Sequence, residues 1–183
     1  MSRFAVFPDG SYVQVAAFRS RDSIASNRLG PVMAAGGGWA DYSFAVEDLD
    51  AAARRAVDAG VILGAVHEVG NTVAHAGPWS LRLLLAGRGA AGDDALPFLV
   101  QDVSGRDVRV PTVAAHPNGA CGIASITVAS AAPAESAARC RSLAGCSPDP
   151  SGGRVTEVLV GSCRISFVPI SGPKAIAGPL SVA

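Results

Sequence analysis

The sequence contains little charge and no excess of either sign. Of its 183 residues only 16% are charged, and 15 lysines and arginines balance 15 aspartates and glutamates. Proteins that bind nucleic acids or membrane surfaces usually carry an excess of basic residues, so the balanced composition argues against both partners. The chain also lacks an apolar run of the roughly 18 residues that a membrane-spanning helix needs. With 49% hydrophobic residues, it has enough material for a globular core.

Cysteine is scarce as well, and its spacing excludes one kind of metal site. Cys121, Cys140, Cys146 and Cys163 contain no C-x-x-C pair, which argues against zinc binding of that type. No long apolar stretch precedes Asp9, so we expect no signal peptide. Reduced cysteines without a leader predict a cytoplasmic protein, and a disulfide between Cys140 and Cys146 under oxidation is left open.

The chain begins with a predicted β-hairpin. Residues 4–18 form two short periodic runs around a Pro-Asp-Gly turn, in which proline presets one backbone angle and glycine accepts a positive φ. Residues 19–38 lose this periodicity and gather serine, arginine and glycine, so we expect a connecting loop. Residues 1–38 are therefore assigned to a hairpin plus linker.

A strand followed by a helix comes next. The segment 42–46 alternates larger apolar residues with smaller or polar ones, as in a half-buried strand. Asp48 is placed to cap a helix whose apolar face includes Val57 and which Gly60 ends. Further strands are predicted at 72–74, 79–86 and 97–103. Residues 39–115 thus form a unit with the order β-α-β-β-β.

The same unit returns in a looser form. A strand is predicted around 125–128, where Ile126 and Val128 alternate with Ser125 and Thr127. It precedes a helix that Pro133 opens, where its missing N–H costs nothing, and that Gly145 ends. Two more strands complete a βαββ unit at residues 116–170. The Gly/Pro-rich residues 171–183 are expected to form a loosely held tail. The repeat predicts an α+β fold in which each sheet carries a helix on one face.

These elements resemble a known family. Their order, together with "GGWADYSFAVEDLDAAARRAVDAGVILG", "LPFLVQD" and "HPNGACGIASITVAS", is similar to the glyoxalase-like proteins of the vicinal oxygen chelate (glyoxalase/bleomycin resistance/dioxygenase) superfamily. The segment "FPDGSYVQVAAF" resembles the family's "GDGTYLELIAF" hairpin. The resemblance spans about residues 4–170. It implies repeated βαβββ modules that form curved mixed β-sheets with helices on the outer face.

The chain departs from the family pattern at its start. Family members begin with a further strand and helix, and that strand often carries a histidine ligand. Residues 1–38 therefore resemble the C-terminal hairpin of an incomplete first module. Truncation, a misassigned start or a strand from a partner would each explain this. The open edge that results predicts a homodimer that covers it.

The resemblance implies a divalent-metal site, but amides occupy two expected ligand positions. Relatives offer glutamate where this chain has Gln14 and Gln101, and neutral amides are weaker ligands than carboxylates. Weak candidates for metal ligands are the three histidines His67, His75 and His116. A turn at Gly70-Asn71 would bring the first two together. The cofactor is left unknown.

Strand alternation selects a face for ligand binding. If the apolar residues of each strand pack under the helices, their neighbours point to the concave side. A polar cleft is predicted from Tyr12, Gln14, Arg82 and Gln101. The same alternation predicts that six further side chains point to the concave side: Ser43, Ser80, Ser125, Thr127, Arg164 and Ser166. Arg82 interrupts an apolar strand and could clamp an anion. The alternatives are a structural ion pair and a sheet face open to solvent.

Three functions remain open. The first is a metal-dependent lyase, isomerase or dioxygenase acting on a small oxygenated molecule, with the metal as Lewis acid. The second is a non-catalytic protein that binds small molecules or sequesters drugs, which needs only a cleft with polar anchors. The third is a truncated, inactive copy. The fold alone does not show whether the chain is an enzyme. It also does not identify the ligand.

Overall fold

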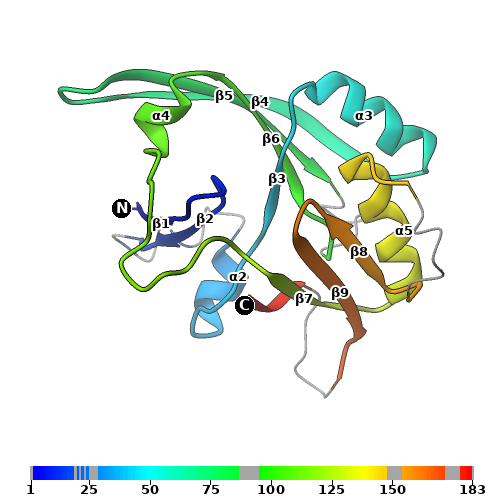
Figure 1. The fold of residues 1–183 in the computed structure, drawn as a ribbon. Coiled ribbons are helices and arrows are strands. Elements are labelled where there is room, and N and C mark those ends of the chain that lie inside the picture. Colours follow the sequence, from blue (N-terminus) through cyan, green and yellow to red (C-terminus); the bar gives the residue numbers. More distant parts are fainter. Residues whose placement is uncertain are drawn as a thin grey trace.

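The computed structural model describes residues 2–18, 20, 22, 24, 29–86, 95–147, 154–171 and 178–182. This part of the chain forms one hairpin and two four-stranded sheets, and helices α3 and α5 lie together on one side of the sheets (Figure 1). The predicted α+β class, with mixed sheets and helices on one face, is confirmed. No helix among the described residues is long and apolar enough to cross a membrane.

The predicted N-terminal hairpin is present. Strands β1 (Ser2–Val6) and β2 (Tyr12–Ala16) pair antiparallel, with Phe4 opposite Gln14. At the turn Gly10 has a φ of +83°, a conformation that glycine adopts without strain. The linker differs from expectation, because a short helix α2 (Gly30–Ala34) begins where Pro31 fits its first turn. The prediction of a continuous loop is wrong for these residues.

The first sheet has the predicted β-α-β-β-β order. It contains β3 (Ser43–Ala45), helix α3 (Leu49–Asp58), β4 (Leu63–Val73), β5 (Gly77–Ala86) and β6 (Phe98–Ser104). The strand order is β3-β6-β5-β4, with β3 parallel to β6 and the other pairs antiparallel. Strand β4 begins at Leu63 rather than at Thr72, so it is much longer than predicted.

Helix α3 begins and ends as the sequence predicts. The Asp48 side chain accepts a hydrogen bond from the backbone N–H of Ala51 at 2.9 Å, which satisfies one of the free donors of the first turn. Gly60 follows the helix with a φ of +73°. Leu49, Ala52 and Ala56 are buried against the sheet, whereas Val57 is 61% exposed and does not belong to the apolar face.

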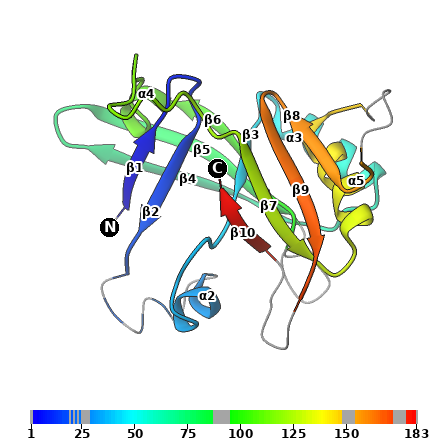
Figure 2. The same cartoon turned by 60° about the horizontal axis from the view of Figure 1, so that its bottom comes forward.

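The second sheet repeats the unit with one addition. It contains β7 (Ser125–Ser130), helix α5 (Pro133–Ala144), β8 (Glu157–Val160), β9 (Cys163–Pro169) and β10 (Gly178–Val182), in the order β10-β7-β9-β8. Strands β7 and β9 are parallel. Strand β10 adds antiparallel to the free edge of β7 (Figure 2), so the prediction of a loosely held tail is wrong for residues 178–182.

Both units share one hydrophobic core. Helices α3 and α5 pack against each other, and their buried side chains join those of both sheets in one cluster. Tyr42, directly before β3, donates a hydrogen bond from its hydroxyl to the carbonyl of Ala95 at 2.6 Å. Cys140 of α5 is fully buried, and this burial raises the pKa of its thiol to about 12. The four cysteines are free thiols.

Candidate ligand-binding site

The four predicted cleft residues do not share one face of the first sheet. Leu84 and Leu99 lie opposite each other and are buried under α3. Arg82 lies opposite Gln101 two residues further along both strands, so this pair shares the helix-covered face. The prediction that Arg82 and Gln101 point to the concave face is therefore wrong. The apolar run around Arg82 fits either phase of alternation, and only the core position of Leu84 decides between them.

Arg82 forms an ion pair with the first turn of α3. Its guanidinium donates to both carboxylate oxygens of Asp50, at 2.8 and 3.0 Å, and to Oε1 of Gln101 at 3.2 Å. The hydrogen bond with Asp50 raises the pKa of Arg82 and lowers the pKa of the Asp50 carboxyl. The Gln101 amide in turn donates to the carbonyl of Glu47 at 2.7 Å. Arg82 thus forms a structural ion pair, which was the alternative to anion binding at this position.

Tyr12 lies at a different place, in a group of five side chains that we call the arginine cluster. Its members are Tyr12, Trp79, Asp102, Arg106 and Arg109. Arg109 donates twice to one oxygen of Asp102, at 2.7 and 3.2 Å, and once to the Tyr12 hydroxyl at 3.1 Å. The Arg109 guanidinium carbon lies 5.8 Å from the centres of both the Tyr12 and the Trp79 rings. Three distant segments of the chain therefore meet here.

The two arginines of the cluster have different environments. The Arg109 side chain is only 9% exposed, whereas that of Arg106 is 41% exposed. Burial alone would lower the pKa of Arg109, but its hydrogen bonds to Tyr12 and Asp102 outweigh this and raise it. Arg106 donates to the second Asp102 oxygen at 2.9 Å and to the Gly10 carbonyl at 2.9 Å. Two guanidinium cations thus share one carboxylate, and one of them remains accessible to solvent.

The local backbone fixes this arrangement. Asp102 of β6 lies opposite Leu81 of β5, on the face turned away from α3. Helix α4 (Arg106–Arg109) begins after Gly105, which has a φ of +61°. A Cβ at Gly105 would overlap the Pro78 carbonyl and touch Trp79. Glycine is required there because the chain reverses directly against β5 and returns Arg109 to Asp102.

A loop from the second unit holds the hairpin against this region. Asp9 donates its backbone N–H to the carbonyl of Cys121 at 3.2 Å, and the Asp9 carboxylate occupies the space that a Cβ at Gly122 would need. The rings of Phe7 and His116 are 5.4 Å apart. Tyr12 is thereby positioned next to Arg109. Gln14 lies exposed on the same hairpin, and its role in ligand binding stays a prediction.

The second sheet presents polar side chains on the face opposite α5, as predicted. Ile126 and Val128 are buried in the core, so Ser125 and Thr127 point the other way. Their register partners on β9 are Arg164 and Ser166. The Arg164 guanidinium lies 3.9 Å from the carboxylate of Glu157. This face of the second sheet thus carries hydroxyls and an exposed arginine.

The candidate metal ligands do not converge. Gly70 and Asn71 lie within β4, paired with Ser80 and Trp79, so they do not form the turn that would join His67 to His75. His67 lies within β4, whereas His75 lies in the turn after it, with a φ of +67°. The strand from His67 to its end at Val73 alone extends about 20 Å. His116 lies in the loop that contacts the hairpin. The described residues contain no group of three or more His, Cys, Asp or Glu side chains suited to a metal ion, and the donor set does not fit the divalent metal that the family resemblance implies.

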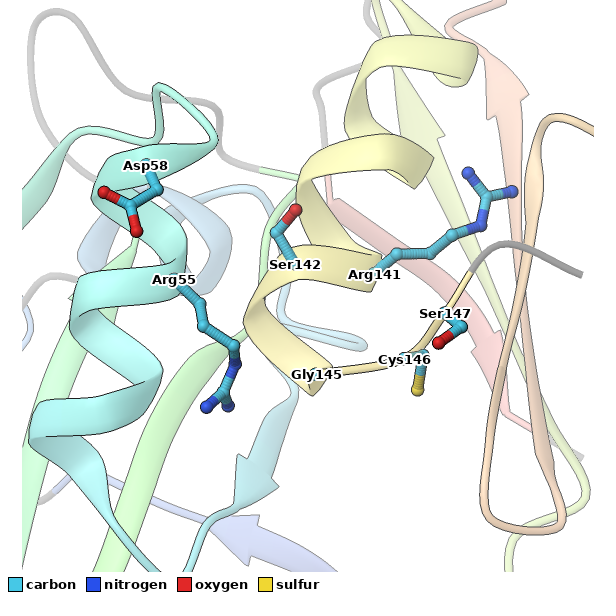
Figure 3. A pocket seen from close by; sticks show the side chains of 7 residues that line it. All are labelled: Arg55, Asp58, Arg141, Ser142, Gly145, Cys146 and Ser147. Carbon is cyan, nitrogen blue, oxygen red and sulfur yellow. The ribbon is translucent and has the colours of Figure 1, made fainter.

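A shallow pocket of about 320 Å³ lies between the ends of α3 and α5 (Figure 3). Its lining includes Arg55 and Arg141, but Arg141 donates to the carbonyls of Val155 and Glu157 instead of turning into the pocket. Arg55 lies against Gly145, where α5 ends. A cation there balances the partial negative charge of the helix end. We interpret this pocket as part of the contact between the helices.

The prediction from sequence missed four residues of the arginine cluster, namely Trp79, Asp102, Arg106 and Arg109. A signal was present in "QDVSGRDVRV", where an aspartate precedes arginines by four and seven residues with a glycine between them. Such spacing brings the charges together when the glycine reverses the chain. The contact with Tyr12 had no local signal, because 97 residues separate Tyr12 from Arg109.

Comparisons with known proteins identify the family. The model of the glyoxalase-like domain family matches residues 2–144, and the chain belongs to this family. A hypothetical protein from Staphylococcus aureus has a similar crystal structure, with a TM-score of 0.58 and 12% sequence identity over 91% of this chain and 72% of that one. At this identity the likeness shows the fold alone. No curated protein matches the sequence significantly.

Proposed function

We propose that this glyoxalase-like protein binds a small anionic organic molecule on the concave side of its sheets, using its own side chains rather than a resident divalent metal. The observation that carries the proposal is the arginine cluster. Its two guanidinium groups share a single carboxylate, and the Arg106 side chain is 41% exposed beside the hairpin. An arginine in this position can take a carboxylate or phosphate as a further acceptor.

The surroundings of the cluster support an organic ligand. Tyr12 and Trp79 provide aromatic surface next to the charged groups, and Leu83 and Leu85 alternate with the core positions of β5 on the same side as Leu81. Sites for small molecules combine such apolar walls with a few fixed polar groups. The chemistry therefore favours a ligand with one anionic group and an aromatic or aliphatic body.

The metal-dependent lyase, isomerase or dioxygenase is the weaker proposal. Gln101, one of the expected ligand positions, bonds to Glu47 and Arg82 on the helix-covered face. The histidines are spread over β4, its turn and the loop near the hairpin. A binding or sequestering protein requires none of these groups to converge. Cytoplasmic location is part of the same proposal, and the four free cysteines support it.

The test is ligand binding in the presence of a metal chelator. Small aliphatic and aromatic carboxylates and organic phosphates would be screened by thermal shift with EDTA, and hits measured by calorimetry. We expect Arg106→Gln to weaken binding of a hit at least tenfold, the loss of about one charged hydrogen bond. Arg82→Gln is the matched control, because that arginine lies on the other face of the sheet, and it should leave affinity unchanged. Equal affinities in all three proteins would overturn the proposed site.

A further inference from the structure

Strand β4 forms a long, exposed edge of the first sheet. It is the outermost strand in the order β3-β6-β5-β4, and in the described part of the chain it pairs only with β5. Residues 64–73 are all exposed, and Val66, Val69 and Val73 are each 40–41% exposed. The β4–β5 hairpin extends away from α3 and α5 (Figure 1). An edge strand of this kind is a template for pairing with another strand.

From Val66 to Val73 the strand carries few of the features that usually protect such an edge, and its register shift against β5 lies before this segment, between Leu63 and Val66. Its sequence "LGAVHEVGNTV" contains no lysine, arginine or proline. The one carboxylate, Glu68, lies directly opposite Arg82 of β5, whose guanidinium also pairs with Asp50. Water-exposed valines and free backbone groups therefore remain available along most of the strand.

We propose that β4 pairs antiparallel with β4 of a second copy of this chain, about a two-fold axis that passes through Val69. In a symmetric antiparallel pair, residues at equal distances from the axis face each other on the same side of the sheet. The opposed pairs would be Val69 with Val69, Glu68 with Gly70, His67 with Asn71, Val66 with Thr72 and Ala65 with Val73. The two sheets then continue as one.

The polar side chains of the strand disfavour the registers centred on Glu68 and His67. An axis through Glu68 would set two carboxylates directly opposite each other, which destabilises a strand pair. An axis through His67 would oppose the two imidazoles and set Val66 against Glu68. With the axis at Val69, Glu68 faces a glycine without a side chain, two valines meet at the centre, and every residue from 65 to 73 is paired. β-Branched pairs of this type contribute about 0.2–1 kcal/mol each.

Cysteine cross-linking tests both the dimer and its register. The variants are Val69→Cys and Val73→Cys, each made with Cys121→Ser to remove an exposed native thiol. Opposed residues at the axis have Cβ atoms about 4.5–5.5 Å apart, close enough for a disulfide after slight adjustment. The two Val73 positions would be about 26 Å apart across the dimer.

Mild oxidation should therefore convert most of the Val69→Cys protein to a covalent dimer and leave Val73→Cys a monomer on a non-reducing gel. The two valines are equally exposed at 40%, so non-specific collision would cross-link both alike. Equal cross-linking, or sedimentation of the wild-type chain as a monomer at high micromolar concentration, would overturn the proposal.

A charge at the axis provides an independent measurement. Val69→Lys would oppose two ammonium groups and should weaken dimerisation at least tenfold in sedimentation equilibrium. Val155→Lys, a 70% exposed position outside β4, should leave it unchanged. Circular dichroism would check that both variants fold. An unaltered dimerisation constant for Val69→Lys would contradict the pairing. This test does not depend on the ligand-binding proposal.

Discussion

The guanidinium of Arg82 meets the carboxylate of Asp50 through two hydrogen bonds, at 2.8 and 3.0 Å, and so joins the middle of β5 to the first turn of α3. The single arginine in this apolar strand thus stabilises the contact between helix α3 and the sheet. The arginines suited to ligand binding lie on the opposite face, where Asp102 holds Arg106 and Arg109.

The first prediction concerns Asp102. Asp102→Ala leaves the 9% exposed Arg109 without its carboxylate, and we expect the free energy of unfolding to fall by about 2 kcal/mol or more. Urea denaturation measures this change. Glu135→Ala removes the partner of Arg139 in an exposed pair on α5 and should cost no more than about 0.5 kcal/mol. Equal losses would show that the arginine cluster does not hold the hairpin in place.

The second prediction concerns the contact between Asp9 and Gly122. A Cβ in Gly122→Ala would displace the Asp9 carboxylate, which accepts two hydrogen bonds from Ser11, at 2.6 and 2.8 Å. We expect a loss of about 1 kcal/mol in urea denaturation. Asp9→Ala removes the obstacle, so the double variant should be no less stable than Asp9→Ala alone. Additive losses would contradict the contact.

The third prediction concerns the cap of α3. Asp48→Ala removes the acceptor for the Ala51 N–H and should lower the free energy of unfolding by about 1 kcal/mol. Asp58→Ala, at the other end of the helix, serves as the control. A carboxylate there opposes the helix dipole, so its removal should not destabilise the protein. Thermal unfolding of both variants distinguishes the two ends.

The fourth prediction is a dependence of stability on alkaline pH. Burial raises the pKa of Cys140 to about 12 in the folded protein, from an ordinary value of 9.0. Between these values the unfolded chain releases the thiol proton and the folded chain keeps it. The free energy of unfolding therefore falls as pH rises above about 9, by about 1.4 kcal/mol per pH unit from this group. Cys140→Ala should lose this part of the slope in urea denaturation from pH 8 to 10.5, and an unchanged slope would refute the assignment.

Local patterns predicted the elements but not every face or contact. The segment 42–46 alternates clearly, and Phe44 is indeed buried under α3. The run "LRLLLA" is apolar in both phases, so the side to which Arg82 points depends on tertiary packing. Strand β10 escaped prediction because its pairing with β7 comes from a Gly/Pro-rich segment far along the chain. Contacts such as Tyr12 with Arg109 arise only when distant segments fold together.

The most direct test of the account is metal content. The chain would be offered manganese, iron, nickel and zinc, passed through gel filtration and assayed for metal per protein. We predict far less than one ion per chain, with carboxylate binding that persists in EDTA. Near-stoichiometric metal that a chelator removes, together with loss of ligand binding, would contradict the account and favour the metal-dependent enzyme.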